Sequence, residues 1–146
     1  MKIYLAGRWS RYNFIRSCAA ELRNIGFEVV STWHDEARSS NVVDDETMRQ
    51  CAIRAVNQIN RCTIFVYFAN PRYHRYAGGA EHSEYAHAIV NGCTVLHIGE
   101  RTQLWHWLPD VTVLDSWSEC KAQLQIVGQA PATIEPTSAK GNGVKW

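Results

Sequence analysis

The feature that most constrains the fold is the apolar run TIFVYF at residues 63–68. A strand with one face in water alternates apolar and polar residues, whereas this run is apolar almost throughout. It is also too short for a typical buried helix. The run therefore predicts a strand buried on both faces, which is typical of a parallel sheet covered by helices.

Shorter runs of the same kind recur along the chain. We expect four more strands, at 2–6, 27–32, 94–98 and 111–114. Amphipathic segments between them predict helices at 12–25, 46–60, 81–91 and 116–126. This alternation predicts a single-domain α/β fold, Rossmann-like (flavodoxin-like), with a five-stranded parallel sheet flanked by helices.

Two of the helices have an apolar stripe that we expect to be buried, and Ser116 is a candidate cap for the last helix. In the first helix the stripe consists of Phe14, Cys18, Leu22 and Ile25. In the second it consists of Met48, Cys51, Ala52, Ala55, Val56 and Ile59.

Length and composition predict one domain over residues 1–127. The segment 128–146 is rich in Gly, Pro, Ser, Thr and Ala and is expected to be a flexible tail. With 15 basic and 14 acidic residues, the net charge of +1 gives no overall signal for nucleic acid or an anionic membrane. The chain has no apolar run near the roughly 20 residues that cross a bilayer. A cytoplasmic protein is expected.

The chain has five cysteines and no CxxC pair. They are spread along apolar segments, which favours buried thiols over a metal site. We expect no metal and no other cofactor.

Three polar loops follow the first three predicted strands and should meet at the carboxyl edge of the sheet, where ligands bind in such folds. The first contains Gly7, Arg8, Trp9, Ser10 and Arg11, at the start of a helix, and could hold a phosphate or sugar hydroxyls. The second contains Trp33 and His34. The third leads into AGGAEHSEYAHAIVNG, where Gly78 and Gly79 allow a tight turn before Glu81, His82 and Glu84.

These carboxylates have two readings. Acidic residues in a first helical turn favour the helix dipole, which would explain them without any chemistry. At the rim of an inward-facing side, however, a carboxylate is partly desolvated, which suits a nucleophile or general base.

The chain resembles the nucleoside 2-deoxyribosyltransferase family and the nucleotide N-glycosidases related to it. The resemblance covers about residues 1–120 and rests on MKIYLAG, TIFVYF, GGAEHSEYAHAIVNGCTVLHIG and, more loosely, LWHWLPDV. The family has a glutamate followed at intervals of four by alanine and glycine, and Glu84, Ala88 and Gly92 fit that spacing. Glu81 does not, since Tyr85 follows it at that interval.

The resemblance implies an enzyme, a hydrolase or a transferase, in which Glu84 attacks the anomeric carbon of a nucleoside or nucleotide. It implies a covalent glycosyl intermediate that water or a second base resolves, with Glu81 and His82 as supporting groups. The arginines near residue 8 favour a 5′-monophosphate, and Trp9, Trp33 and Tyr76 are candidates to stack on the base. The resemblance also implies a homodimer or higher homo-oligomer.

The family often has an aspartate in the helix before the third strand, where this chain has Ala55, Asn57 and Gln58. Gly78 stands where a second acidic residue is frequent. The proton donor to the base would then be another group: Asp35, Glu36, His34, Glu81 or His82. The alternative is a catalytically inactive nucleotide-binding module with the same fold. Binding of single-stranded nucleic acid through the aromatic and arginine residues is a weaker hypothesis, because the net charge is near zero.

Overall fold

The computed structural model describes residues 1–36, 44–70 and 80–129, with a five-stranded sheet at the centre. The strands are β1 (Lys2–Gly7), β2 (Glu28–Val29), β3 (Ile64–Phe68), β4 (Thr94–Ile98) and β5 (Val111–Leu114). They lie in the order β2-β1-β3-β4-β5, and every neighbouring pair is parallel. This is the flavodoxin-like order, so the fold class predicted from the sequence is confirmed.

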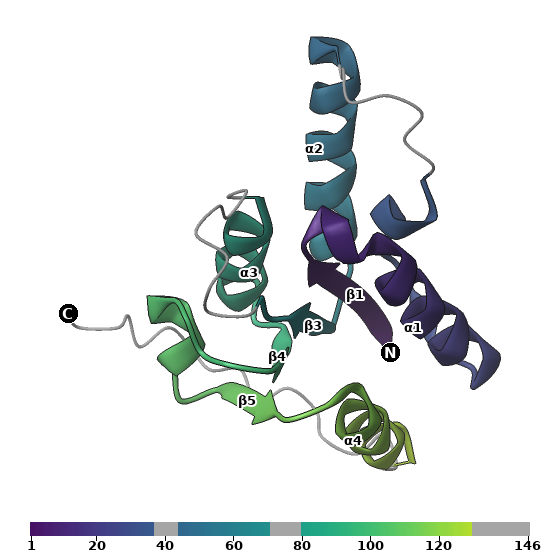
Figure 1. The fold of residues 1–146 in the computed structure, drawn as a ribbon, viewed down its shortest axis with the longest axis vertical. Helices are drawn as coiled ribbons and strands as arrows, with labels where there is room; N and C mark the ends of the chain where they lie inside the picture. The colour runs from purple at the N-terminus through teal and green to yellow at the C-terminus, as the bar shows by residue number, and fades with distance from the viewer. Residues whose placement is uncertain (37–43, 71–79, 130–146) are drawn as a thin grey trace.

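Helices cover both faces of this sheet (Figure 1). The described helices are α1 (Tyr12–Asn24), α2 (Asp45–Ile59), α3 (Ala80–Val90) and α4 (Trp117–Gln129). Short 3-10 turns are η1 (Trp9–Arg11), η2 (Trp33–Asp35) and η3 (Leu104–Trp107). Residues of α1 and α4 pack in one apolar cluster, and residues of α2 and α3 in the other.

The central strand β3 contributes to both clusters because its side chains alternate between the two faces of the sheet. Ile64, Val66 and Phe68 face α1 and α4. Phe65 and Tyr67 belong to the cluster on the other face. All five side chains are buried, which explains why this stretch is apolar without alternation.

Strand β2 is shorter than the 27–32 expected from the sequence. After it, the Val30 amide donates one more ladder hydrogen bond to the Ile3 carbonyl, at 2.8 Å. The Leu5 amide then donates to the Ser31 hydroxyl at 3.0 Å. A side-chain acceptor thus takes the place of the next backbone rung, and the chain turns into η2.

The buried stripe of α1 is rotated relative to the one we expected. Phe14 and Ile25 are 42% and 47% exposed, so their assignment to the core is wrong. The helix ends at Asn24, which leaves Ile25 beyond its packing face. The buried residues are Ile15, Cys18, Ala19 and Leu22.

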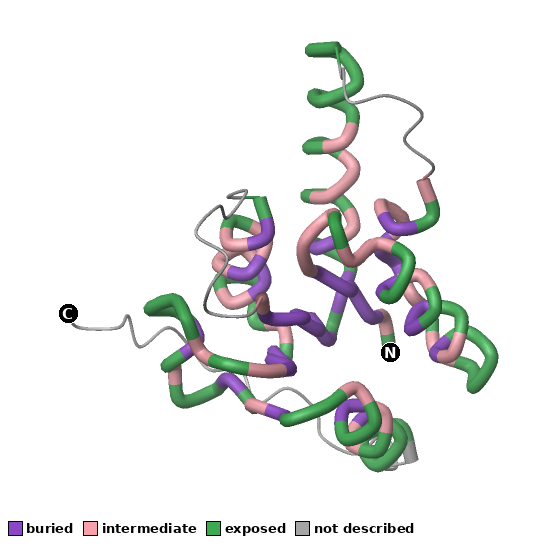
Figure 2. Tube along the Cα trace, viewed as in Figure 1, coloured by how far each residue is buried: buried purple, intermediate pink, exposed green. Residues whose placement is uncertain are grey.

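The apolar stripe of α2 is not a core stripe over most of its length, which corrects the second expectation. Within this helix only Ile59 is buried, and Met48 and Val56 are 52% and 43% exposed. Figures 1 and 2 show the helix standing away from the sheet, largely half-buried or exposed. Its apolar face lines a cleft instead.

The turns around the last two helices agree with the sequence pattern. Ser116 caps α4, since its hydroxyl accepts from the Glu119 amide at 3.2 Å. The helix runs to Gln129, two residues into the segment expected to be a tail, and residues 130–146 lie outside the described part. After α3 the chain turns at Gly92 with a φ of +72°, a conformation that glycine adopts without strain.

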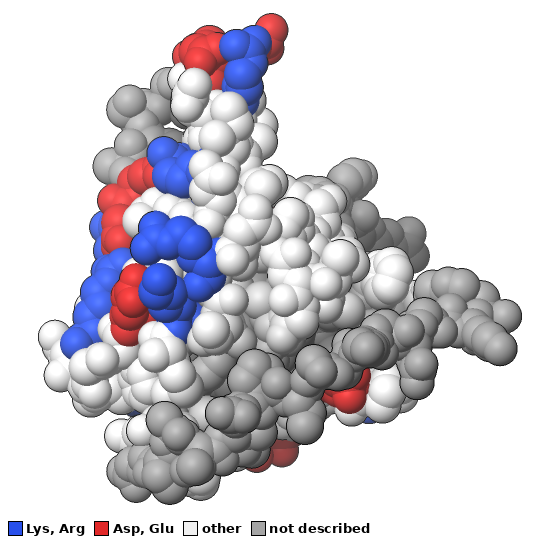
Figure 3. Space-filling model, turned by 180° about the vertical axis from the view of Figure 1, so that it is seen from behind, with Lys and Arg blue, Asp and Glu red and all other residues white. Residues whose placement is uncertain are grey.

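Charged residues of both signs are interspersed on the surface seen from behind in Figure 3, at the far end of α2 and along the edge below it. Ion pairs such as Arg23–Asp35 (2.9 Å) and Arg61–Glu28 (3.6 Å) join opposite charges. None of the described helices is both long and apolar enough to span a lipid bilayer.

Candidate active site

A cleft of about 970 Å³ opens beside the carboxyl end of β1. Its walls come from β1, η1, η2, α2 and the first turns of α3. Parallel α/β sheets bind ligands at this edge, and the volume suits a nucleoside-sized molecule. The predicted loops after the first and second strands therefore do meet at one cavity. Residues 71–79, which include Tyr76, Gly78 and Gly79, lie outside the described part of the chain.

Glu84 lies on α3 in the wall of this cleft and is partly buried. The hydroxyl of Tyr4, on β1, donates a hydrogen bond to its Oε1 at 2.9 Å. Burial raises the pKa of Glu84 to about 7; the Tyr4 bond opposes the rise and the charge of Glu81 adds to it. The carboxyl group is therefore about half ionised near neutral pH.

The position of the Tyr4 ring is fixed, and its hydroxyl remains protonated and can donate to Glu84. Its ring stacks on Phe65, with centroids 5.5 Å apart and planes at 6°. Burial and then the adjacent Glu84 charge raise the pKa of Tyr4 far above its ordinary value, so the hydroxyl stays protonated. A fixed, protonated donor against a carboxylate stabilises the ionised form of that carboxylate.

Glu81 lies one turn earlier on α3, also in the cleft wall, and is more buried than Glu84. Its Oε1 accepts a long hydrogen bond of 3.4 Å from the Asn70 side-chain amide. The two carboxylates thus share the cleft, but only Glu84 is hydrogen-bonded to Tyr4.

The turn between β1 and η1 brings the predicted residues Gly7, Arg8, Trp9 and Ser10 to the cleft. A Cβ on Gly7 would lie 2.8 Å from Ile15 Cδ1 and 3.3 Å from Phe68 Cβ, so the end of the Ile15 side chain would have to shift. The turn therefore packs closely on α1 and β3 at this position.

Two indole rings, those of Trp9 and Trp33, line the cleft. Trp9 stacks on Tyr12, with ring centroids 5.4 Å apart, and lies 5.9 Å from Trp33. The Trp33 indole N–H donates to the Leu5 carbonyl at 2.8 Å, which fixes its ring. Flat rings held in this way present surfaces on which a base can stack.

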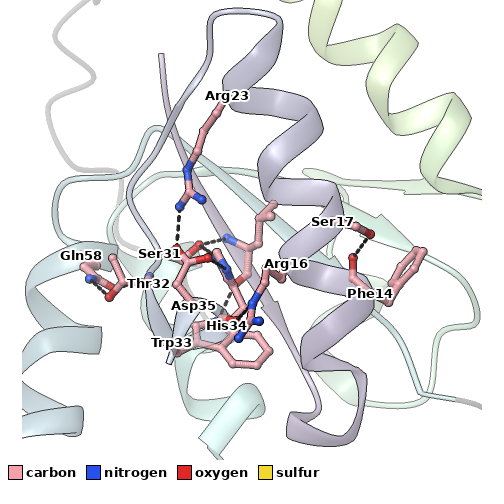
Figure 4. Close-up of polar contacts among 11 residues, drawn as sticks. Phe14, Arg16, Ser17, Arg23, Ser31, Thr32, Trp33, His34, Asp35 and Gln58 are labelled. Carbon is pink, nitrogen blue, oxygen red and sulfur yellow. Dashed lines mark hydrogen bonds and ion pairs between the residues drawn. The ribbon is translucent and has the colours of Figure 1, made fainter. Parts of the chain in front are cut away.

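His34 does not line the cleft, although the sequence suggested it as a binding residue. It is fully buried beneath Trp33 (Figure 4). Its Nδ1 lies 3.2 Å from Asp35 Oδ1 and its Nε2 lies 3.1 Å from the Ser31 hydroxyl. A carboxylate only accepts, so Nδ1 carries the proton and Nε2 accepts from Ser31. Ser31 is buried too, so this Ser–His–Asp arrangement supports η2 and does not meet substrate.

Arg11 and His82 also point elsewhere. The Arg11 guanidinium donates to the Ala69 carbonyl at 3.0 Å and lies over the Phe14 ring, which ties the start of α1 to the end of β3. The His82 ring lies 6.5 Å from Tyr67 and 6.4 Å from His106, neither of which lines the cleft.

Only some of the candidates for the proton donor to the base lie in the cleft wall. Glu36 and Glu81 line the cleft, whereas Asp35, His34 and His82 do not. Glu36 pairs with Arg54 at 2.7 Å, so its carboxylate already has a cationic partner. Burial raises the pKa of Asp35, but Arg23 and His34 outweigh it and leave that pKa below its ordinary value. Of the two proton-donor candidates that line the cleft, Glu81 is the one that forms no ion pair with another residue in the described part of the chain.

Sequence reasoning missed Tyr4 and the α2 wall. The signal for Tyr4 was available, because a hydroxyl in a buried strand needs a partner. For α2, residues such as Cys51, Ala52 and Ala55 have the spacing of a core stripe, and nothing in the pattern tells a core from a cleft.

The described cysteines and histidines do not form a metal centre. No three His, Cys, Asp or Glu side chains of the described residues are grouped to hold an ion. All five cysteines are free. Cys18, Cys62 and Cys120 are buried, as expected, while Cys51 and Cys93 are partly exposed.

No protein-family model and no curated protein sequence matches the chain. Solved structures do. A CMP N-glycosidase from Clostridium botulinum aligns with a TM-score of 0.56 at 18% identity, over 86% of this chain and 99% of that one. A 2-deoxyribosyltransferase from Bacillus psychrosaccharolyticus aligns with a TM-score of 0.64 at 17% identity, over 83% and 90%.

A conserved protein from Enterococcus faecalis V583 aligns with a TM-score of 0.60 at 10% identity, over 87% of this chain and 98% of that one. At these identities the likeness is one of fold. The chain therefore has the fold of the deoxyribosyltransferase and N-glycosidase enzymes that its sequence resembles.

Proposed function

We propose that the protein cleaves or exchanges the N-glycosidic bond of a nucleoside or nucleotide, with Glu84 as the nucleophile. The observation that carries this proposal is the pairing of Glu84 with Tyr4 in the wall of the cleft, 2.9 Å apart. The shared fold of an N-glycosidase and a deoxyribosyltransferase supports the same class of reaction.

In the proposed reaction a Glu84 carboxylate oxygen bonds to the anomeric carbon, and the bond from that carbon to the base nitrogen breaks. The base leaves with the electron pair and takes up a proton. Water or a second base then attacks the same carbon and releases the carboxylate. Because the transition state resembles an oxocarbenium ion, an adjacent carboxylate stabilises its positive charge.

The raised pKa of Glu84 suits the role of a nucleophile. A pKa near 7 gives a useful fraction of carboxylate at neutral pH, and partial burial keeps that carboxylate weakly hydrated. Tyr4 limits the rise in pKa that burial alone would cause. Glu81 is the cleft group that we propose as proton donor to the departing base.

The substrate we favour is a 5′-monophosphate. Arg8 and Ser10 line the cleft at the end of β1 and supply a charge and a hydroxyl for a phosphate. Trp9 and Trp33 supply ring surfaces, and the apolar α2 wall completes a base-sized recess. We also propose a homodimer or larger homo-oligomer, as the resemblance implies, which light scattering measures.

The test is release of free base, followed by chromatography, from a panel of ribo- and deoxynucleosides and their 5′-monophosphates. We expect release from at least one of them, and faster release from its monophosphate. Glu84→Gln should lower kcat/KM at least about a thousandfold, on the order of 4 kcal/mol in the barrier. Mass spectrometry of quenched reactions should find a glycosyl adduct on the peptide that contains Glu84.

The matched control is Glu28→Gln, because Glu28 lies on β2 and pairs with Arg61 at the surface. It should leave base release unchanged. Full activity of Glu84→Gln would refute the nucleophile assignment. If no compound releases base but a monophosphate raises the thermal unfolding midpoint, the inactive nucleotide-binding module is the correct reading.

A further inference from the structure

Two thiols lie in contact at the amino ends of β3 and β4, whereas the cleft lies at the carboxyl end of β1. The sulfur atoms of Cys62 and Cys93 are 3.2 Å apart, although the residues are 31 positions apart in sequence. Cys62 lies two positions before Ile64, the first residue of β3, and Cys93 lies one position before Thr94, the first residue of β4. The Cys93 thiol also donates to the Cys62 carbonyl at 3.4 Å.

The backbone around these thiols holds them at a distance that a disulfide can bridge. Strands β3 and β4 are paired in parallel from Ile64 and Thr94 onward. The Thr94 amide also donates to the Thr63 carbonyl at 3.0 Å, beside both cysteines. Extended by one position, this register sets Cys93 opposite Thr63, so Cys62 is one residue off a direct pairing. With strands about 4.8 Å apart and a rise of about 3.3 Å per residue, the diagonal Cα separation is about 5.8 Å, within the range found in disulfides. The sulfurs need to approach by about 1 Å to reach the S–S bond length of about 2.05 Å.

We propose that Cys62 and Cys93 are a dithiol that a low-molecular-weight disulfide oxidises to an intramolecular disulfide, closing the segment that carries β3 and α3 into a covalent loop. This site lies outside the cleft, so the proposal stands whether or not the protein is a glycosidase. The loop contains Glu81 and Glu84, so oxidation would restrict the part of the chain that positions both cleft carboxylates.

The order of the two steps follows from exposure. Cys93 is partly exposed, whereas Cys62 is buried and burial raises the pKa of its thiol. The Cys93 thiolate therefore attacks one sulfur of the oxidant, whose S–S bond breaks and releases one small thiol. Cys62 then attacks the Cys93 sulfur of the mixed disulfide and displaces the second small thiol. The two protons of the protein thiols leave with the two released thiols.

The test is incubation of the full chain with oxidised glutathione, then denaturation, alkylation of remaining thiols and peptide mapping by mass spectrometry. We expect a linked Cys62–Cys93 peptide, reversed by a reducing agent, and alkylation of the other three cysteines. The thermal unfolding midpoint should rise by about 5 °C or more, because the bond removes conformations of the unfolded loop.

Single variants test the order of attack and keep the result interpretable. Cys62→Ala should stop at one glutathione on Cys93, whereas Cys93→Ala should leave Cys62 largely unmodified. Cys51→Ser is the matched control, since Cys51 is the other partly exposed thiol, and it should form the bond as the native chain does. Alkylation of both Cys62 and Cys93 after oxidation, or a linked pair of other cysteines, would overturn the proposal.

Discussion

Helix α3 has titratable groups on two sides, and burial favours the neutral form on both. On the cleft side, burial raises the pKa of Glu84 to about 7. On the side facing β4 and η3, Tyr85 packs against two imidazoles, with its ring centroid 4.7 Å from that of His106 and 6.0 Å from that of His97. Burial lowers the pKa of His106 to about 4, with smaller contributions from His97 and His82.

The difference between the two sides is access to a cavity. His97 donates from Nε2 to the Glu100 carbonyl at 3.0 Å, which leaves Nδ1 to accept from Tyr85 at 3.4 Å. His106 Nδ1 accepts from the amides of Thr102 and Gln103 at 3.1 and 3.3 Å. These two buried imidazoles make hydrogen bonds within the protein in their neutral forms. Glu84, by contrast, faces the cleft. A shifted pKa thus indicates a reactive group only where a ligand can reach that group.

The largest expected effect on stability comes from Glu84→Gln. The folded-state pKa of about 7 lies above the ordinary 4.5, so the native chain becomes less stable as pH rises between these values. Glutamine does not ionise and still accepts from Tyr4. The variant should be more stable than the native chain by about 2–3 kcal/mol above about pH 7 and nearly equal to it below about pH 4.5, by urea unfolding. A difference independent of pH would contradict the raised pKa.

For His106, on the side of α3 that faces β4 and η3, the pH dependence of stability has the opposite sign. The folded-state pKa of His106, about 4, lies below the ordinary 6.5, so stability is lost as pH falls from 6.5 to 4. Between about pH 7.5 and pH 5 this residue should account for about 2 kcal/mol of that loss. His106→Asn keeps an acceptor for the two amides and should flatten the stability profile by that amount. An unchanged slope would assign the loss to His97, His34 or other groups.

Tyr4→Phe should move the pH dependence of base release. Removal of a donor to the carboxylate raises the pKa of Glu84, so the acidic limb of the kcat/KM profile should shift by about 1 unit to higher pH. Activity near pH 6 should then fall about tenfold, with little change near pH 9. A uniform fall at all pH values would mean that Tyr4 only shapes the cleft.

The smallest effect should come from Tyr85→Phe, which removes the long bond to His97. It should cost about 1 kcal/mol of unfolding free energy, because the buried Nδ1 of His97 loses its donor. Base release should be unchanged, because Tyr85 does not line the cleft. A large loss of activity would break the division between the two sides of α3.

Local patterns were enough to predict the strands and the order of elements. The apolar run at 63–68 requires two covered faces, and alternation of strands with helices requires parallel pairing. The edge strand β2 was predicted too long because Ser31 replaces a backbone acceptor, which no propensity records. The stripe of α1 was misplaced because residues one position apart fit a helical repeat almost equally well.

For the candidate site, the sequence by itself predicted that Trp9, Trp33, Glu81 and Glu84 lie at the carboxyl edge, and these residues line the cleft. It named His34 and Asp35 as well, which do not. The resemblance, through the spacing of Glu84, Ala88 and Gly92, also favoured Glu84 over Glu81 as the nucleophile. Only the tertiary structure decided that Tyr4 meets Glu84, 80 positions away in sequence. It also decided that His34 and Arg11 are used in packing and that the apolar face of α2 borders a cleft. Local spacing fixes which side of an element a residue occupies, but what lies opposite depends on how distant elements pack, and burial, pKa and access all follow from that packing.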